Sequence, residues 1–160
     1  MSIKIGDKIP DVEVRTMGEQ GPETVRTGDV LGTGKVVLFA VPGAFTPGCS
    51  KIHLPGFVAN ADDVLAKGVD KIACIAVNDA WVMQAWGESQ GVGDKILMLG
   101  DGNAEFTKAM GLEFDGGGIG LGVRSQRYAA VIEDGVITSL DVEEKPGVDV
   151  SSCESVLTRL

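Results

Sequence analysis

Three continuous apolar runs, each of strand length, divide the middle of the chain. They read Val-Val-Leu-Phe-Ala-Val at residues 36–41, Ile-Ala-Cys-Ile-Ala-Val at 72–77 and Ile-Leu-Met-Leu at 96–99. Runs without alternating polar positions are typical of strands buried on both faces of a sheet. Each run precedes a segment expected to be helical, at about residues 49–67, 80–90 and 104–110. This alternation predicts parallel strands joined by helical crossovers, in a sheet covered on both faces.

The N-terminal part and the glycine-rich part lack this rhythm. Residues 3–14 predict an initial strand, and residues 15–29, rich in Gly, Glu and Thr, predict a hairpin or a loop. Residues 111–122 contain six glycines and predict a plain loop. A phosphate-binding loop is the alternative for 111–122, but Glu113 and Asp115 lie inside it and no Lys-Ser/Thr helix start follows.

The C-terminal part has the pattern of a β-hairpin followed by a helix. Strands are expected at 128–132 and 136–142 around the turn Glu133-Asp134-Gly135, and the pair Ser151-Ser152 is expected to cap a helix at 153–160. Taken with the parallel strands, these elements predict an α/β fold of the thioredoxin-like type. Its central mixed β-sheet is flanked by helices and carries an N-terminal extension and a C-terminal β-hairpin plus helix.

Size and charge narrow the function classes. At 160 residues and 44% hydrophobic content, the chain is expected to form a single domain over residues 1–160. Its 23 acidic and 14 basic residues give a net charge of -9, which disfavours nucleic acid and anionic membranes as partners. The N-terminus lacks an apolar signal core, and no apolar run approaches the roughly 20 residues that span a bilayer. We expect a cytoplasmic protein, with a removed organellar transit peptide as the alternative.

Cysteine usage points to redox or nucleophilic chemistry rather than to a scaffold. The three cysteines, Cys49, Cys74 and Cys153, form no Cys-x-x-Cys pair, and with the single histidine His53 they form no cluster typical of zinc. No metal site is therefore expected. A secreted disulfide framework is also disfavoured, because the cysteines are few and far apart.

Cys49 has the local sequence of a reactive thiol. The apolar run at 36–41 stops at Pro42-Gly43, and Thr46-Pro47-Gly48-Cys49 reads as a turn that leads into a helix. Unpaired N–H groups in the first turn of a helix favour a thiolate over a thiol. A buried, inert cysteine is the alternative, and it is the commoner state of a lone cysteine.

The pattern Pro42-x-x-x-Thr46-x-x-Cys49 resembles the active-site motif of the peroxiredoxin family. The surrounding residues 42–57 look like those of the type II, atypical two-cysteine subfamily, and similar stretches follow at 77–86, 100–107 and 120–128. The resemblance implies a thiol peroxidase that reduces hydrogen peroxide and alkyl hydroperoxides on a thioredoxin fold. It also implies a homodimer and no cofactor, because the sulfur itself carries the electrons.

The chemistry of peroxide reduction suits the residues that carry this resemblance. Cys49 would attack the peroxide and become a sulfenic acid, while the Thr46 hydroxyl would lie beside both the sulfur and the peroxide. Arg127, with Arg124 as second choice, would hold the thiolate and the peroxide oxygens with its fork of N–H donors. Pro42 completes the expected catalytic set.

Further residues are assigned to the pocket. Phe45, Gly48, His53 and Leu121 are expected to line it, together with Leu112, Phe114 and Ile119 as an apolar wall. His53 follows Cys49 by four positions and so shares its helical face, where it could tune the thiolate or serve only in packing. Trp81 and Trp86 are expected in the core or at an interface.

The thiol that reduces the sulfenic acid is left open among three routes. The resemblance places Cys153 first as the resolving cysteine and Cys74 second, because the apolar surroundings of Cys74 predict an inert, buried thiol. Direct reduction by glutathione, glutaredoxin or thioredoxin is the third route. A thioredoxin-fold binding or chaperone-like module without peroxidase chemistry is the alternative function.

Overall fold

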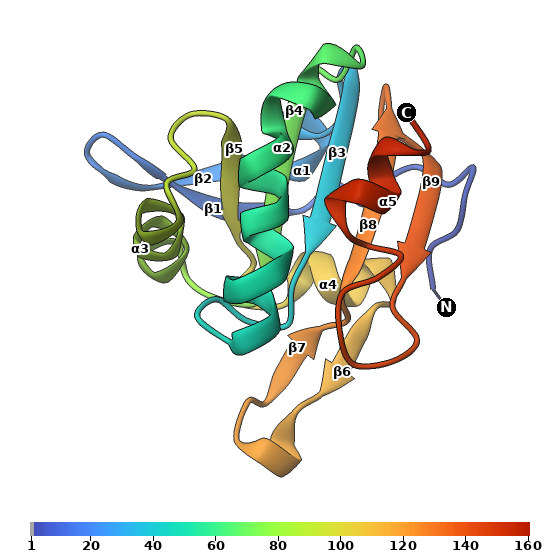
Figure 1. Cartoon of the computed structure of the whole chain (residues 1–160). Helices are drawn as coiled ribbons and strands as arrows, with labels where there is room; N and C mark the ends of the chain where they lie inside the picture. The colour runs from blue at the N-terminus through green and yellow to red at the C-terminus, as the bar shows by residue number, and fades with distance from the viewer. Residues whose placement is uncertain (1) are drawn as a thin grey trace.

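A seven-stranded mixed sheet forms the centre of the computed structural model, which describes residues 2–160 (Figure 1). The spatial strand order is β2-β1-β5-β4-β3-β8-β9. The strands are β1 (Glu13–Gly18), β2 (Gly21–Arg26), β3 (Lys35–Ala40), β4 (Lys71–Ala76), β5 (Ile96–Gly100), β8 (Tyr128–Glu133) and β9 (Val136–Val142). Strands β3, β4 and β5 are parallel, and β8 pairs antiparallel with β3. The predicted mixed, thioredoxin-like sheet is therefore confirmed.

Helices cover both faces of this sheet. They are α1 (Thr27–Val30), α2 (Leu54–Ala66), α3 (Ala80–Gln90), α4 (Glu105–Met110) and α5 (Cys153–Leu157), and a π-helical segment, Cys49–His53, precedes α2. Successive side chains of β3 point to opposite faces of the sheet and join two separate hydrophobic clusters. Phe39 packs with α2, α3 and α5 on one face, whereas Leu38 packs with α4 and β1 on the other. Figure 1 shows α2 and α5 on the near face of the sheet. Among the helices of residues 2–160, none combines the length and the apolar content needed to cross a membrane.

The N-terminal segment corrects one prediction. An initial strand over residues 3–14 is wrong, because the first strand begins only at Glu13. The preceding residues turn at Gly6, whose φ is +95°, and touch the sheet through one isolated bridge between Lys8 and Val136. Pro10 then lacks the N–H group that a ladder requires. Residues 13–26 form the predicted hairpin.

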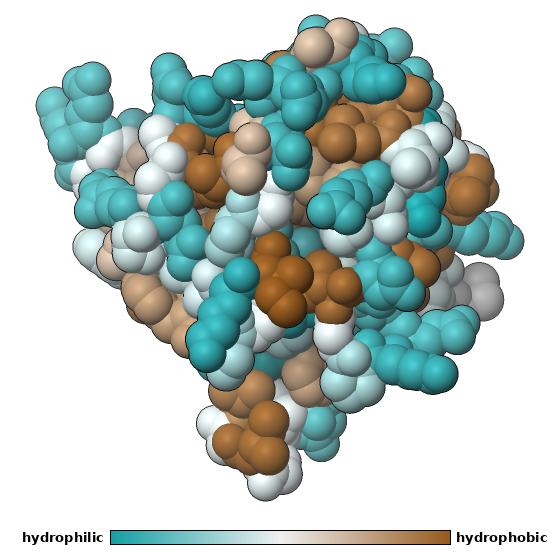
Figure 2. All heavy atoms as spheres, viewed as in Figure 1, coloured by the Kyte–Doolittle hydropathy of each residue, from teal (hydrophilic) through white to brown (hydrophobic). Residues whose placement is uncertain are grey.

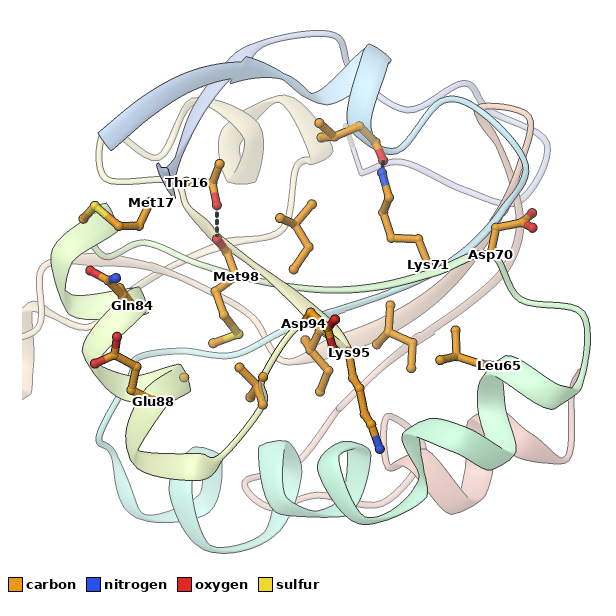
Figure 3. Close-up of a pocket in the computed structure, with 17 residues that line it drawn as sticks. Thr16, Met17, Leu65, Asp70, Lys71, Gln84, Glu88, Asp94, Lys95 and Met98 are labelled. Carbon is orange, nitrogen blue, oxygen red and sulfur yellow. Dashed lines mark hydrogen bonds between the residues drawn. The ribbon is translucent and has the colours of Figure 1, made fainter. Parts of the chain in front are cut away.

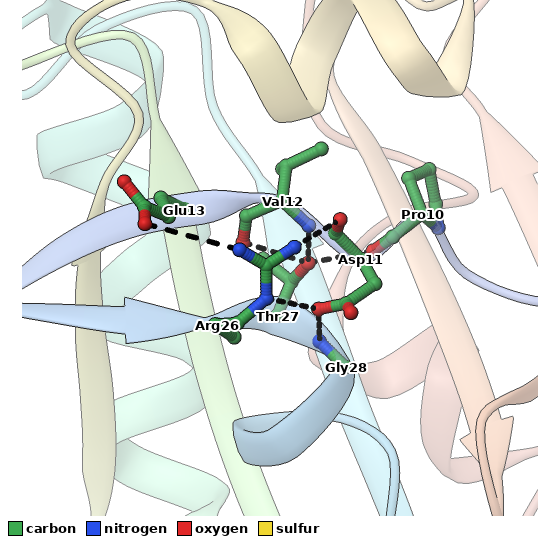
Figure 4. Close-up of polar contacts among 7 residues, drawn as sticks. All are labelled: Pro10, Asp11, Val12, Glu13, Arg26, Thr27 and Gly28. Atoms are coloured by element: carbon green, nitrogen blue, oxygen red, sulfur yellow. Dashed lines mark hydrogen bonds and ion pairs between the residues drawn. The ribbon is translucent and has the colours of Figure 1, made fainter.

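A polar cluster fixes this segment against the hairpin (Figure 4). The Thr27 hydroxyl is fully buried, donates to the Pro10 carbonyl at 2.6 Å and accepts from the Val12 N–H at 2.9 Å. The Arg26 guanidinium donates to the Asp11 carboxylate at 3.1 Å and, at its other end, to the Asp11 carbonyl at 2.8 Å. The hydrogen bond from Arg26 lowers the pKa of Asp11. Since the ion pair is exposed, it fixes the path of the chain more than it adds stability.

The glycine-rich segment corrects a second prediction. Instead of a plain loop, residues 111–122 contribute to a two-stranded ribbon of β6 (Glu113–Asp115) and β7 (Val123–Ser125), joined through a short 3₁₀ turn at Gly117–Ile119. The ribbon projects from the body of the molecule (Figure 1). Its strands are only three residues long, so no hydrophobic period distinguishes them in the sequence.

Candidate active site

The turn after β3 is shaped by its proline and its threonine. Val41 makes the last sheet bond, from its N–H to the Ile75 carbonyl at 3.2 Å, and Pro42 has no N–H with which to continue. Thr46 then closes the turn: its hydroxyl donates to the Gly43 carbonyl at 2.6 Å, and its N–H donates to the same oxygen at 3.3 Å. This places the following residues at the start of a helix.

The helix begins with a π-helical turn, in which a proline leaves one carbonyl without its backbone donor. The Leu54 N–H donates to the Cys49 carbonyl, five residues earlier, and in this spacing the Ser50 carbonyl would need the N–H of residue 55. Residue 55 is Pro55, which has none. The side-chain amide of Gln90 supplies the missing bond, donating to the Ser50 carbonyl at 3.0 Å. Helix α3 thus stabilises the distorted turn that carries Cys49.

The Cys49 sulfur lies against a guanidinium group. Arg127 Nη2 donates to Cys49 Sγ at 3.1 Å, and the cysteine has no exposed surface. A charged donor at this distance stabilises an anionic sulfur. Gly48 makes room for the contact, because a Cβ atom there would lie only 3.2 Å from Arg127 Nη2. Gly48 therefore lies under the guanidinium rather than on a free pocket wall.

His53 holds the other arm of the same guanidinium. Arg127 Nη1 lies 2.9 Å from His53 Nδ1, and His53 Nε2 lies 2.8 Å from the Ser151 carbonyl. Burial, with a smaller contribution from the Arg127 charge, lowers the pKa of His53 from 6.5 to about 4, so the ring is uncharged near neutral pH. The ring also packs against Phe39 and Phe57, at centroid distances of 5.0 and 5.7 Å.

The second arginine has a different position. Arg124 donates to the Leu121 carbonyl at 2.9 Å and to the Val77 carbonyl at 3.0 Å. It also lies over Gly43, where a Cβ atom would be 3.2 Å from Arg124 Nη1. Arg124 therefore connects the β6–β7 ribbon to the end of β4 and to the turn before Cys49, and Arg127 is the arginine that contacts the sulfur.

The remaining pocket candidates are spread over different environments. Phe45 is 57% exposed and has a left-handed backbone, with φ of +64°. Leu121 is half-buried in the ribbon, and His53 is 1% exposed, behind Arg127. Among the hydrogen bonds of residues 2–160, none joins the Thr46 hydroxyl to Cys49. Its proton is engaged by the Gly43 carbonyl, which leaves its lone pairs free to accept.

Both other cysteines are buried thiols. Cys74 lies in the middle of β4, and burial raises its pKa well above the ordinary value, with the Cys49 charge as a second cause. Cys153 begins α5, and burial, aided by Asp63 and Glu154, raises its pKa to about 12. Cys153 packs near Gly56 of α2: a Cβ atom added to Gly56 would lie 4.0 Å from the Cβ atom of Cys153. In the folded protein neither thiol ionises near neutral pH.

Several residues that build the site carried no signal in the sequence. Gln90 and Trp86, from α3, hold Ser50, whose hydroxyl accepts from Trp86 Nε1 at 2.9 Å. Glu143 and Ser151 lie beyond β9. The Ser151 carbonyl contacts His53, and the Glu143 carboxylate bonds Ser151. The missing N–H of Pro55, by contrast, can be read directly from the sequence.

Two cavities lie away from this site. One of about 850 Å³ opens between β5, α3 and the β1–β2 hairpin, lined by residues such as Thr16, Lys71 and Met98 (Figure 3). A second of about 240 Å³ lies beside Trp81 and Asp101. Neither is lined by Cys49, Thr46 or Arg127. Within residues 2–160, no three His, Cys, Asp or Glu side chains converge to hold a metal ion.

Comparison with known proteins defines first the class and then the family. The Redoxin family profile matches residues 4–157, which identifies a thiol-redox protein of the thioredoxin fold. A crystal structure of reduced Prx3 in complex with hydrogen peroxide from Vibrio vulnificus has a TM-score of 0.94 and 49% identity, with 98% of each chain covered. The chloroplastic Peroxiredoxin-2E-2 of Oryza sativa is 49% identical over 99% of this chain and 73% of its own length. Peroxiredoxin-2B of Arabidopsis thaliana is 41% identical over 99% and 98%, respectively.

These similarities place the chain in the peroxiredoxin family, among type II relatives. It is accordingly a thiol peroxidase, an enzyme that reduces peroxides at the expense of a thiol reductant. The resemblance of residues 42–57 to this family is confirmed.

Proposed function

We propose that Cys49 is the peroxidatic cysteine and that Arg127 and Thr46 activate the peroxide against it. The observation that carries this assignment is the 3.1 Å hydrogen bond from Arg127 Nη2 to Cys49 Sγ. Cys49 is the cysteine to which a cationic donor is bonded in the described residues. A nucleophilic thiolate needs such a partner.

The proposed reaction is an in-line displacement at oxygen. The thiolate attacks the terminal oxygen of the hydroperoxide, so that an S–O bond forms while the O–O bond breaks. Sulfur is oxidised to the sulfenic acid, and the departing alkoxide takes a proton from solvent to become the alcohol, or water in the case of hydrogen peroxide. The Arg127 fork stabilises the charge that moves onto oxygen, and the free lone pairs of Thr46 accept the peroxide O–H. Pro42 ends the sheet pairing of β3 and so starts the turn that carries Thr46 and Cys49.

Access to the sulfur requires a movement of the turn. Cys49 is fully buried, so a peroxide reaches it only when residues 42–48 shift. Phe45 is a large, exposed side chain of this turn, and its strained backbone makes it the first candidate to move. Phe45 and Leu121 would then form apolar walls suited to alkyl hydroperoxides.

We further propose that Cys153 resolves the sulfenic acid. Its thiol would attack the Cys49 sulfur, forming a disulfide and releasing water. Because Cys153 is buried and protonated, the first turn of α5 must open before it can react. Cys74 lies within a central strand and would require a much larger opening. Glutathione, glutaredoxin or thioredoxin then reduces the enzyme, or acts on Cys49 directly.

Hydroperoxide consumption by matched cysteine variants tests these roles. Cys49→Ser should abolish turnover, whereas Cys74→Ser should retain it, because both are buried and only Cys49 has the Arg127 contact. Equal rates for wild type and Cys49→Ser would refute the assignment of Cys49. Mass spectrometry after one equivalent of peroxide should show a Cys49–Cys153 disulfide. A Cys49–Cys74 disulfide, or none, would refute the role of Cys153.

A homodimer is proposed from the exposed apolar residues. Large apolar side chains lie exposed in the active-site turn, the π-helical segment after it, the start of α3 and the β6–β7 ribbon: Phe45, Ile52, Trp81, Ile119 and Val123. Figure 2 shows apolar surface at the end of the ribbon. Contacts between copies would cover such residues. Sedimentation velocity of wild type and Trp81→Ser tests this, with a monomeric wild type as the contrary result.

We also propose a domain organisation and a choice between two cell compartments. We regard residues 1–160 as one domain, since one continuous sheet organises it. Two relatives are named chloroplastic, so an organellar location stands beside the cytoplasmic one expected from the sequence. Imaging of the tagged full-length product of the gene would distinguish them.

A further inference from the structure

Arg127 is held at both ends by a closed circuit of hydrogen bonds. Its main-chain carbonyl accepts from the Glu143 N–H at 2.9 Å. The Glu143 carboxylate accepts from the Ser151 N–H at 2.9 Å and from the Ser151 hydroxyl at 2.6 Å. The Ser151 carbonyl then contacts His53, and His53 contacts the Arg127 guanidinium, which closes the circuit.

The partners of His53 determine its tautomer. A carbonyl oxygen can only accept, so His53 Nε2 must carry the hydrogen that it donates to Ser151 at 2.8 Å. A guanidinium can only donate, so His53 Nδ1 must be the bare nitrogen that accepts from Arg127 at 2.9 Å. Neither the other tautomer nor the imidazolium can make both bonds. Within this circuit His53 therefore has a single protonation state.

This bond restrains a side chain that would otherwise be mobile. A free arginine side chain samples many rotamers, so fixing it costs conformational entropy. Here Nη1 is anchored on His53 while Nη2 is directed at Cys49 Sγ. The anchor itself is rigid, because the His53 ring is 1% exposed and lies against Phe39 and Phe57.

We propose that His53 is a positioning residue for peroxide reduction, which holds one arm of Arg127 so that the other arm stays on Cys49, and that the Glu143–Ser151 segment holds His53 in turn. The proposal rests on the proposed roles of Cys49 and Arg127 and extends them to residues that do not touch the peroxide. This role differs from lining the substrate pocket, because both ring nitrogens of His53 are bonded to protein atoms.

A double-mutant cycle tests whether His53 acts through Arg127. The second-order rate of Cys49 oxidation by hydrogen peroxide is measured by stopped-flow fluorescence, with Trp86, bonded to the neighbouring Ser50, as reporter. His53→Leu should slow this step by roughly 10- to 100-fold, the usual effect of losing a residue that orients a reacting group. In the Arg127→Gln background the same change should cost almost nothing. An equal loss in both backgrounds, or no loss in either, would overturn the proposal.

Two smaller variants test each half of the contact and guard against misfolding of His53→Leu. The His53→Asn amide can reach the position of Nδ1 and accept from Arg127, whereas the His53→Gln amide can reach the position of Nε2 and donate to Ser151. If the contact with Arg127 is what matters, the His53→Asn enzyme reacts faster with peroxide than the His53→Gln enzyme. A His53→Gln enzyme that reacts as fast as His53→Asn, or faster, overturns the proposal. Cys49→Ser distinguishes this failure from failure of the proposed function, since it tests the nucleophile alone.

Discussion

The side-chain amide of Gln90 replaces a backbone donor that Pro55 cannot supply, and it bonds the Ser50 carbonyl at 3.0 Å. Removing the amide leaves that part-buried carbonyl without a partner. We expect Gln90→Leu to lower the free energy of unfolding by about 1 to 2 kcal/mol. Urea denaturation measures the change.

Gln84 provides the control for this experiment. It also lies on α3 but is exposed, and no side-chain hydrogen bond to it occurs among the described residues. Gln84→Leu should change the free energy of unfolding by less than about 0.5 kcal/mol. Equal effects of the two substitutions would show that the Ser50 carbonyl gains nothing from Gln90.

Gly48 should separate activity from stability. Its backbone is helical, with φ of -63° and ψ of -38°, so alanine fits the conformation and should stabilise the helix start slightly. The added Cβ would lie 3.2 Å from Arg127 Nη2 and displace the guanidinium. We expect Gly48→Ala to lower kcat/KM for hydroperoxide by roughly 10-fold, or about 1.4 kcal/mol of barrier. Gly118→Ala, where a Cβ meets nothing within 4 Å, should leave kcat/KM unchanged.

The two arginines should respond differently to the same substitution. A lysine at position 127 keeps the charge but cannot contact His53 and Cys49 together, so Arg127→Lys should lower kcat/KM by roughly 10²- to 10³-fold. Arg124→Lys should mainly lower the free energy of unfolding, by about 1 kcal/mol, because Arg124 bonds main-chain carbonyls. Peroxidase kinetics and urea denaturation of both variants measure this. A larger kinetic loss for Arg124→Lys would contradict the assignment.

Stability below neutral pH should depend on His53. Burial lowers its pKa from 6.5 in the unfolded chain to about 4 in the folded one. Between these values the unfolded chain binds the additional proton, so the free energy of unfolding falls as the pH is lowered. From pH 7 to pH 5 the loss should be about 2 kcal/mol, and His53→Gln should lack it. Urea denaturation at both pH values measures the difference.

Glu143, the acidic residue of the same hydrogen-bond circuit, changes its charge below this pH range. Partial burial opposes ionisation of Glu143, but hydrogen bonds from Ser151 and from main-chain N–H groups outweigh it and lower its pKa below 4.5. The stability that Glu143 contributes is therefore present above pH 4.5 and is lost as the pH falls through its folded pKa. Parallel pH dependence of wild type and His53→Gln above pH 5 would contradict the prediction.

The sequence predicted those parts of the fold where a pattern of apolar residues continues over a whole element or is stopped by a proline. The runs at 36–41 and 72–77 indicated buried parallel strands because no polar residue breaks them, and Pro42 marked the end of the first. The β6–β7 ribbon was missed, since strands of three residues are too short to show a period. The initial strand at 3–14 was wrong because Pro10 and the turn at Gly6 outweigh the apolar residues there.

The active site was predictable where one short motif carries it, and not where the tertiary structure assembles it. Thr46 and Cys49 lie in one turn, and family resemblance added Arg127, which directly precedes β8. The contacts of His53 with Ser151, and of Gln90 with Ser50, join segments 98 and 40 residues apart. Side-chain to main-chain bonds of this kind leave no periodic trace in a sequence.

Opening of α5 should limit the resolving step, and its N-cap controls that opening. The Ser152 hydroxyl accepts from the Ser155 N–H at 3.1 Å, and Cys153 follows directly. Ser152→Ala should weaken the helix start by about 1 kcal/mol, which raises the open population roughly fivefold. In a single turnover without reductant, the Cys49–Cys153 disulfide should form about fivefold faster, as followed by quenched mass spectrometry. Ser89→Ala, an exposed serine on α3, should leave the rate unchanged. An unchanged rate for Ser152→Ala, with amide exchange in α5 accelerated, would show that opening of this helix does not limit resolution.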